Sequence, residues 1–516
     1  MTNYDYIVIG AGSAGCVVAN RLTEDSETTV LLLEAGNPDT KPEIQIPAEC
    51  FNILGSEVDW AYFTEPEPYL NNRKIFHPRG KVLGGSSSIN FMLYVRGNPH
   101  DYNHWQELGN PGWSYQDVLP YFKKSENQQR GASEYHGVDG ELNVTDLISP
   151  APISQRFVEV SVAMGYQNNP DFNGMHQEGA GLYQMTIKDG KRHSTAAAFL
   201  VPILDRPNLT TTTGSLVTRL LFEGTRAVGV EYLHEETLHQ VRVNREVILS
   251  AGAFDSPKLL MLSGIGNQEY LESLGIPVVV DLPGVGQNLQ DHPLIPVVHL
   301  ATQDLHPAIT SSIVEAGLFL HSEGNLDAAP DLQLIFSPIL LTFPPRSDSG
   351  FTGLVCLIHP ESIGSVSLRS PDPKDPPMIR MNYLQSESDV QKVIAGIKLL
   401  RKLFQTSAFD EFRGEEVAPG ADVESDEALE AYIREACGTV FHPVGTCKMG
   451  TDSMAVVDSE LRVHGVEGLR VVDASIMPTI TTGNTNAPII AISEKAADLI
   501  KAAGCVSQQV QEAMAN

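Results

Sequence analysis

The opening of the chain decides its fold: residues 4–22 read YDYIVIGAGSAGCVVANRL. The apolar run from Tyr4 to Ile9 is typical of a short buried strand, and a helix-like stretch over 16–22 follows a glycine-rich turn. Residues 29–33, TVLLL, predict a second buried strand that ends at Glu34. A strand, a helix and a second strand in this order form a βαβ unit, which opens a dinucleotide-binding fold.

The three glycines of this turn stand where a pyrophosphate site needs them. The first permits a tight turn, the second lets the backbone approach a phosphate, and the third allows the helix to pack closely on the strand. Glu34 comes 19 residues after the last glycine. A carboxylate there accepts hydrogen bonds from ribose hydroxyls and repels a 2′-phosphate, so the motif predicts FAD or NAD rather than NADP. The expected contacts are Gly10, Gly12, Ser13, Ala14, Gly15, Glu34 and Ala35.

Length and composition narrow the class of protein. The chain has 516 residues, enough for about three domains or for one large two-domain enzyme. Apolar residues make up 42% and charged residues 19%, which excludes global disorder. The formal net charge is 35 − 64 = −29. So acidic a chain repels nucleic acids and anionic membranes, and we expect no nucleic-acid partner.

Cysteines and apolar runs predict where the protein is found. The six cysteines are sparse and form no C-x-x-C pair, as expected of reduced thiols in a reducing compartment. The N-terminus has no signal-peptide pattern, and no run of 18 apolar residues occurs. We therefore expect a cytoplasmic protein without a transmembrane segment and without a bound metal.

Periodicity gives a coarse map of the remaining chain. Residues 36–80 are typical of an extended loop, and residues 210–250 alternate as in a β-meander. Residues 252–275 are predicted to be helical with a start at Ser256-Pro257, and amphipathic helices are predicted over 389–404 and 426–437. Residues 468–472 predict another buried strand, and a final helix follows over 488–502 with a proline near its first turn.

Four further segments resemble signatures of the glucose–methanol–choline (GMC) oxidoreductase family. They are GKVLGGSSSIN at 80–90, GAFDSPKLLMLSGIG at 252–266, FHPVGTCKMG at 441–450, and the stretch from VDAS at 472–475 to GNTNAP at 483–488. They occur in family order, and with the first motif the resemblance spans residues 5–500. It implies a mixed α/β fold, FAD as the cofactor, and in most members the oxidation of an alcohol.

The resemblance also implies a division into domains. A discontinuous Rossmann-type FAD-binding domain is expected from residues 1–155, 195–293 and 438–516. A substrate-binding domain is expected from residues 156–194 and 294–437, with a large antiparallel sheet capped by helices.

Further cofactor contacts follow from the matched positions. The resemblance implies backbone contact of Val217 with the adenine. It places Ala251 and Gly252 near the phosphates, and Asp473 and Ala474 near the ribityl chain and pyrophosphate; a cap or turn is the structural alternative for Asp473. Some relatives attach FAD covalently through a histidine just before the residue at Asn90. Ile89 stands there, so we expect non-covalent FAD. The other implied contacts are Gly80, Val82, Gly84, Gly85, Ser86, Asn90, Phe91, Met92, Phe441, Asn486 and Ala487.

Alcohol oxidation removes a proton from oxygen and a hydride from carbon. The flavin takes the hydride, so the protein must supply a base, and histidine is the natural choice. The resemblance places His442 over the flavin as this base, with Asn484 as its partner toward the substrate oxygen. Asn486 is the rival for that second position and is assigned to the flavin side. His292 and His359 are interpreted as structural.

The substrate is predicted from what the sequence lacks. Residues 294–303 contain no acidic residue, which disfavours a quaternary ammonium substrate such as choline. Phe91 and Phe441 would form an apolar pocket, which favours an aromatic or medium-chain primary alcohol. Oxygen or another acceptor would then reoxidise the flavin. The oligomeric state stays open, with a homodimer as one option.

Four alternatives remain. A hydroxynitrile lyase would keep the histidine without hydride transfer. The fatty-acid photodecarboxylase branch carries a cysteine where Ile358 stands, with Cys356 two residues away. A NAD-dependent dehydrogenase would leave segments 80–97 and 441–450 unexplained. A flavin-binding protein without turnover would not need both His442 and Asn484.

Overall fold

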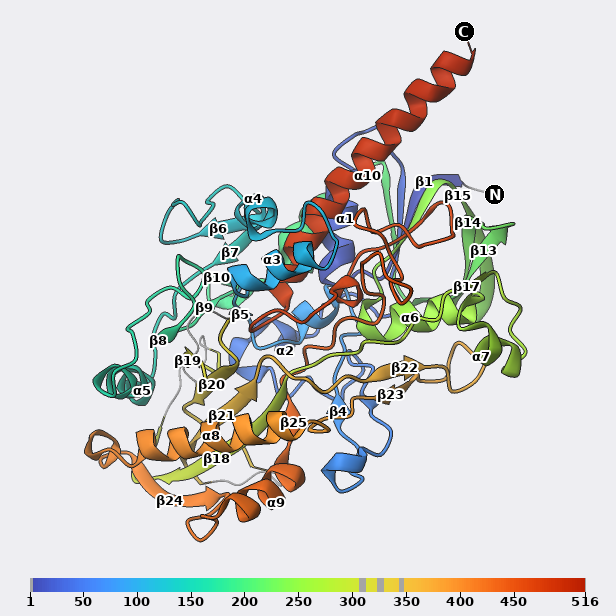
Figure 1. Ribbon diagram of the computed structural model, residues 1–516. Helices are drawn as coiled ribbons and strands as arrows, with labels where there is room; N and C mark the ends of the chain where they lie inside the picture. The colour runs from blue at the N-terminus through green and yellow to red at the C-terminus, as the bar shows by residue number, and fades with distance from the viewer. Residues whose placement is uncertain (1–2, 306–311, 323–328, 343–347, 516) are drawn as a thin grey trace.

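Two seven-stranded sheets organise the chain in the computed structural model (Figure 1). The structure describes residues 3–305, 312–322, 329–342 and 348–515, and the side chains of the C-terminal helix through residue 504. One sheet carries the N-terminal βαβ unit and the other is antiparallel, so the expected mixed α/β fold is confirmed.

The first sheet has the strand order β12-β2-β1-β15-β14-β13, with β26 beside β15. Its parallel part is formed by β12 (Leu209–Thr212), β2 (Val30–Leu33), β1 (Asn3–Ile9), β15 (Thr237–Leu249) and β26 (Leu469–Val471). The predicted meander supplies β13 (Ser215–Glu223) and β14 (Arg226–His234), which pair antiparallel. Helix α1 (Ser13–Leu22) connects β1 to β2, as the opening motif predicted.

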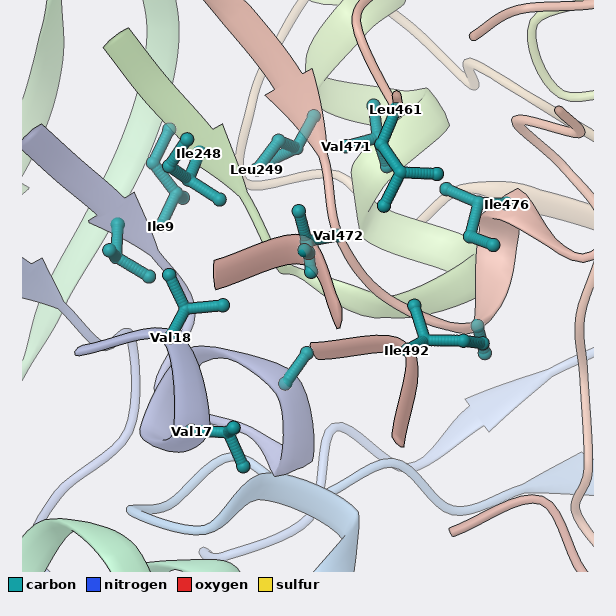
Figure 2. Close-up of a cluster of buried hydrophobic side chains, with 14 of the residues drawn as sticks. Ile9, Val17, Val18, Ile248, Leu249, Leu461, Val471, Val472, Ile476 and Ile492 are labelled. Atoms are coloured by element: carbon teal, nitrogen blue, oxygen red, sulfur yellow. The ribbon is translucent and has the colours of Figure 1, made fainter. Parts of the chain in front are cut away.

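The core of this sheet joins segments far apart in sequence. Figure 2 shows Ile9, Ile248 and Val472, at or beside the ends of neighbouring strands, close to Val18 of α1 and Ile492 of α10 (Asn486–Ala515). Each of these side chains is at least 96% buried, and burial of one such side chain stabilises the fold by roughly 1.5–3 kcal/mol. The C-terminal helix therefore packs on the first helix of the chain and completes the domain.

The second sheet is antiparallel and occupies a separate part of the molecule (Figure 1). Its order is β24-β18-β21-β20-β19-β8, with β25 beside β18. Helices α5 (Pro152–Ala163), α8 (Glu387–Phe404) and α9 (Asp426–Ala436) pack on one face, so the predicted sheet capped by helices is present. The division into domains at the predicted residue numbers stays a prediction. The strands are β8 (Gly179–Leu182), β18 (Pro293–Ala301), β19 (Ala316–Leu320), β20 (Leu332–Ser337), β21 (Gly350–Leu357), β24 (Arg413–Ala418) and β25 (Gly438–Thr439).

The predicted start of the helix after Ser256-Pro257 is wrong. Helix α6 (Gly252–Leu262) begins directly after the strand and contains Pro257. A proline inside a helix leaves the carbonyl four residues earlier without its donor. Here the Thr446 hydroxyl donates to the Ala253 carbonyl at 2.6 Å, so the helix continues through the proline.

Short elements also occupy the segment predicted as extended loop. Residues 36–80 contain α2 (Pro42–Gln45), two 3-10 turns (Pro47–Glu49 and Pro68–Leu70) and the paired strands β3 (Tyr62–Phe63) and β4 (Phe76–His77). These pieces are too short to carry a periodic pattern that sequence reading detects.

Candidate active site

The three glycines after β1 have different surroundings. Gly10 adopts φ +94°, and a Cβ there would lie 2.5 Å from the Ser250 carbonyl oxygen. A Cβ on Gly15 would lie 1.9 Å from the Gly10 carbonyl oxygen, so this glycine lets α1 pack against the strand. A Cβ on Gly12 would meet only the Gly85 Cα, at 3.9 Å. The protein's own packing therefore leaves room for a side chain at Gly12, and the space beside this residue is free for a ligand.

The space beside Gly12 belongs to a pocket between the glycine-rich turn after β1 and the start of α6. Gly252 also lies on it, with φ +84° and no protein atom within 4 Å of a Cβ placed there. The N-terminus of α1 opens into the same space, and its free N–H groups and dipole favour a phosphate. The cradle therefore fits a dinucleotide pyrophosphate. The predicted residues that line it are Gly10, Gly12, Ser13, Ala14, Glu34, Ala35, Gly80, Gly85, Ser86, Val217, Ala251, Gly252, Asp473 and Ala474.

Glu34 lies buried at the end of β2. Its carboxylate accepts hydrogen bonds from the backbone N–H groups of Ala11 and Gly36, each at 2.8 Å. Burial raises its pKa to about 7, and the two backbone hydrogen bonds oppose this increase. A carboxylate offers about four acceptor positions, so two remain for ribose hydroxyls.

Asp473 acts as the cap that the sequence left as an alternative. Its carboxylate accepts from the Gly252 N–H at 2.8 Å, the Ser256 hydroxyl at 2.5 Å, and the Ser475 N–H and hydroxyl at 2.8 and 2.6 Å. These bonds fix the start of α6 beside the pocket. Direct contact of Asp473 with a cofactor stays a prediction.

The loop over 80–92 is held by an arginine that sequence reasoning missed. The Asn90 side-chain oxygen accepts from the Met92 N–H at 3.0 Å and from Arg192 Nη1 at 2.8 Å. Arg192 also donates to the carbonyls of Ser87 and Ile44. Burial lowers its pKa to about 10, still high enough to keep the charge at neutral pH. No motif in the sequence pointed to it.

Several predicted contacts lie outside the pocket lining. Val82 packs with Ile89 in an apolar cluster, and Gly84 is crowded by Ser88, whose Oγ would lie 2.2 Å from an added Cβ. Asn486, the first residue of α10, accepts from the Ser13 hydroxyl at 2.7 Å, and this bond joins α10 to the dinucleotide loop. Ala487 is buried beside it.

His442 and Asn484 are brought together as predicted. His442 Nε2 lies 3.3 Å from Asn484 Nδ2, and the Asn484 Oδ1 atom is buried without a partner among the described residues. On the other side of the ring, His442 Nδ1 lies 3.0 Å from His292 Nδ1. His292, interpreted from the sequence as structural, therefore contacts the candidate base directly. His359 instead contacts Thr482, at 2.9 Å.

The turn that carries His442 is strained and firmly held. Phe441 adopts φ +66°, a conformation that costs a non-glycine residue about 1–3 kcal/mol. Asp291 accepts from the His442 N–H at 2.7 Å and from the side chains of Thr439 and Tyr383. Arg79 donates to the Phe441 carbonyl at 2.6 Å. These bonds offset the strain and fix the position of the imidazole.

His442 is neutral at ordinary pH. Burial, and to a smaller extent the nearby charge of Arg79, together lower its pKa to about 3. A neutral imidazole has one free lone pair, which a general base requires.

Apolar residues stand two positions from each histidine of this site in the sequence: Val440 before His442 and Leu294 after His292. Phe91, Leu294 and Val440 pack against a buried cluster on the second sheet. The Phe441 ring packs edge-on against His77, with centroids 6.5 Å apart. A pocket shared by Phe91 and Phe441 stays a prediction. The cluster contains Met92, Phe172, Tyr183, Phe319, Ile335, Leu354, Cys356 and Ile358, among others.

The part of the chain that the structure describes holds neither a candidate metal cluster nor a membrane-spanning helix. No group of His, Cys, Asp or Glu there could hold a metal ion. The five cysteines whose side chains are described are free and buried. No helix within the described ranges is both long enough and apolar enough to cross a membrane.

Comparison with known proteins places the chain in a family. Residues 4–294 match the N-terminal model of the GMC oxidoreductases, and residues 360–493 match the C-terminal model. The chain is a GMC oxidoreductase. The GMC oxidoreductase acts on CH–OH donors, and FAD is its cofactor, which agrees with the cradle at Gly12 and Gly252.

Relatives of this GMC oxidoreductase cover almost its whole length. The mitochondrial choline dehydrogenase of Mus musculus is 44% identical, over 96% of this chain and 89% of the relative. The oxygen-dependent choline dehydrogenase of Pseudomonas savastanoi pv. phaseolicola is 46% identical, over 97% and 94%. Among solved structures, pyridoxine 4-oxidase from Mesorbium loti superposes with a TM-score of 0.92 at 33% identity, over 96% of this chain and 99% of that one.

Proposed function

We propose that this GMC oxidoreductase oxidises a primary alcohol to the aldehyde, with His442 as general base. The observation that carries the proposal is a pair of half-buried side chains: a neutral histidine with Asn484 Nδ2 3.3 Å from its Nε2 atom. The Arg79, Asp291 and Thr439 bonds hold the turn that presents the imidazole.

The roles of the residues follow from their chemistry. FAD, when bound, supplies the two-electron acceptor that takes the hydride from the carbinol carbon. His442 accepts the hydroxyl proton at Nε2, so the O–H bond breaks and an N–H bond forms. Asn484 hydrogen-bonds the substrate oxygen and does not compete as a base. Helix α10 begins two residues after Asn484, and its positive end favours negative charge that develops there.

We propose that FAD is held without a covalent bond. Ile89, at the position where some relatives carry the attached histidine, is buried among Ile44, Ile53 and Val58. An aliphatic side chain offers no atom for such a bond. The pyrophosphate cradle and the bonds around Glu34 would then supply the affinity.

We infer an uncharged aromatic or medium-chain alcohol as the substrate. Phe91, Leu294 and Val440 pack against one apolar cluster, and the last two stand two positions from His292 and His442 in the sequence. Removal of a quaternary ammonium group from water without a carboxylate or an aromatic cage is costly. Choline is the second candidate, because the relatives that are 44–46% identical are named choline dehydrogenases.

One experiment tests both the reaction and the substrate. The visible spectrum of the purified holoenzyme is recorded without oxygen, before and after hexanol, benzyl alcohol or choline is added. We expect hexanol or benzyl alcohol to bleach the flavin band at least ~10-fold faster than choline does, the size of one or two buried methylene contacts. Faster bleaching by choline would establish the second candidate. A flavin band that no alcohol bleaches would contradict alcohol oxidation and favour the lyase or the photoenzyme.

The electron acceptor, the cellular location and the assembly are part of the proposal. Admission of air to the bleached enzyme would separate an oxidase, which reoxidises at once, from a dehydrogenase that needs another acceptor. A cytoplasmic location agrees with the free cysteines, although the Mus musculus relative is named mitochondrial. A homodimer is proposed without a surface assigned to it.

The pH dependence of the reaction is a further prediction. We expect kcat/KM to stay constant from about pH 8 down to about pH 5, because His442 binds a proton only near its pKa of about 3. Because the pKa of His442 is lowered, its imidazole stays unprotonated, and able to accept a proton, at acidic pH. The charged group that acts on His442 is Arg79, and neutral His292 and the Asp291 carboxylate lie beside its turn. A pH profile with an acidic limb near 6.5 would contradict this expectation.

A further inference from the structure

In the hydrogen bond between His292 and His442, one ring must be the donor and the other the acceptor. Their Nδ1 atoms are 3.0 Å apart and the rings are perpendicular, at 88°. Burial lowers the pKa of both imidazoles, and the proximity of His442 and His359 lowers that of His292 further. Both rings are therefore neutral at pH 7. Between two neutral imidazole nitrogens only one carries the hydrogen, so one ring donates and the other accepts.

The direction decides whether His442 can act as a base. If His442 donates from Nδ1, its Nε2 atom keeps a lone pair for the alcohol proton. If His292 donates instead, the single hydrogen of neutral His442 sits on Nε2, and that nitrogen cannot accept a proton. The Asn484 Nδ2 atom, 3.3 Å from Nε2, fits the first arrangement because an amide N–H needs a lone pair to face.

The surroundings of His292 also favour the first arrangement. The ring nitrogen that faces away from His442 is Nε2, which is buried and makes no hydrogen bond among the described residues. No donor there requires a lone pair on Nε2, so the single hydrogen of neutral His292 can sit on that nitrogen. With its hydrogen on Nε2, His292 has a lone pair at Nδ1 and can only accept from His442.

We propose that His292 is a positioning residue for the reaction: it accepts the Nδ1–H of His442 and so fixes the tautomer in which Nε2 is free to take the alcohol proton. The same hydrogen bond persists when His442 becomes protonated, and it is then a bond from a charged donor. This inference rests on the proposed function, because it concerns the base that alcohol oxidation needs.

A matched pair of substitutions tests it. In His292→Asn the side-chain oxygen stands close to where Nδ1 was and still accepts a hydrogen bond, whereas His292→Leu has a similar shape and no acceptor. We expect His292→Leu to lower kcat by about 10- to 100-fold, the range for a lost hydrogen bond to a charged group. His292→Asn should stay within about threefold of wild type, the scatter of a neutral replacement bond. The KM, the flavin absorbance per protein and the thermal unfolding midpoint should match in the two variants.

Chemical rescue by added imidazole provides a second readout that does not depend on the Asn or the Leu variant. His292→Ala leaves room for added imidazole, which should restore activity in proportion to its concentration, whereas surface substitution His176→Ala should show no such response. Equal losses in the Asn and Leu variants, or no rescue of His292→Ala, would overturn the proposal. Full activity of His442→Ala would instead contradict the proposed base, so the two failures are distinguishable.

Discussion

Substitution of His442 by alanine is expected to lower kcat by at least ~10²-fold, the usual size of a general-base effect. We expect this loss of turnover because no other neutral imidazole lies within hydrogen-bond distance of Asn484 among the described residues. The flavin should stay bound, since His442 does not line the pyrophosphate pocket. The measurement is steady-state turnover of the best alcohol, together with the flavin absorbance per protein.

The control for this variant is His176→Ala. The His176 side chain is exposed, and only its backbone carbonyl takes part in a hydrogen bond, from Asn169. It should leave kcat and the flavin content unchanged. Full turnover by His442→Ala would remove this residue from the mechanism and direct attention to another base.

Substitution of Gly12 by valine should weaken flavin binding while the protein still folds. Gly12 has an extended backbone, φ −78° and ψ −162°, which valine tolerates, and a Cβ would meet no protein atom closer than 3.9 Å. The side chain would occupy the space of the phosphates. Overpacking of this kind costs about 1–3 kcal/mol, so we expect the affinity for FAD to fall by about 10- to 100-fold.

Gly15→Val makes a contrast with the Gly12 variant. A Cβ at Gly15 would lie 1.9 Å from the Gly10 carbonyl oxygen, so α1 would have to move off the strand. This variant should lose folded protein as well as flavin, as circular dichroism and thermal unfolding would show. If Gly12→Val binds FAD as wild type does, the cradle at this glycine is not the pyrophosphate site.

Local physics in the sequence determined the first half of the fold. The glycine turn, the apolar strands over 4–9 and 29–33 and the acidic residue at 34 are close in the chain, and their spacing carries the geometry. The resemblance of the later motifs extended this to FAD and to the pair of His442 and Asn484, which the structure brings within 3.3 Å. The start of α6 was missed, because the hydroxyl that compensates for Pro257 comes from residue 446.

Only the tertiary structure decided what surrounds the base. His292 and His442 are 150 positions apart, and nothing in either segment states that their nitrogens meet at 3.0 Å. Arg192 and Asp291 likewise act through backbone groups of distant loops, which have no sequence signature. A sequence motif identifies which reactive side chain stands at the site. The tautomer, the neutral state and the strained turn depend on burial and on partners that only the packing of the two sheets supplies.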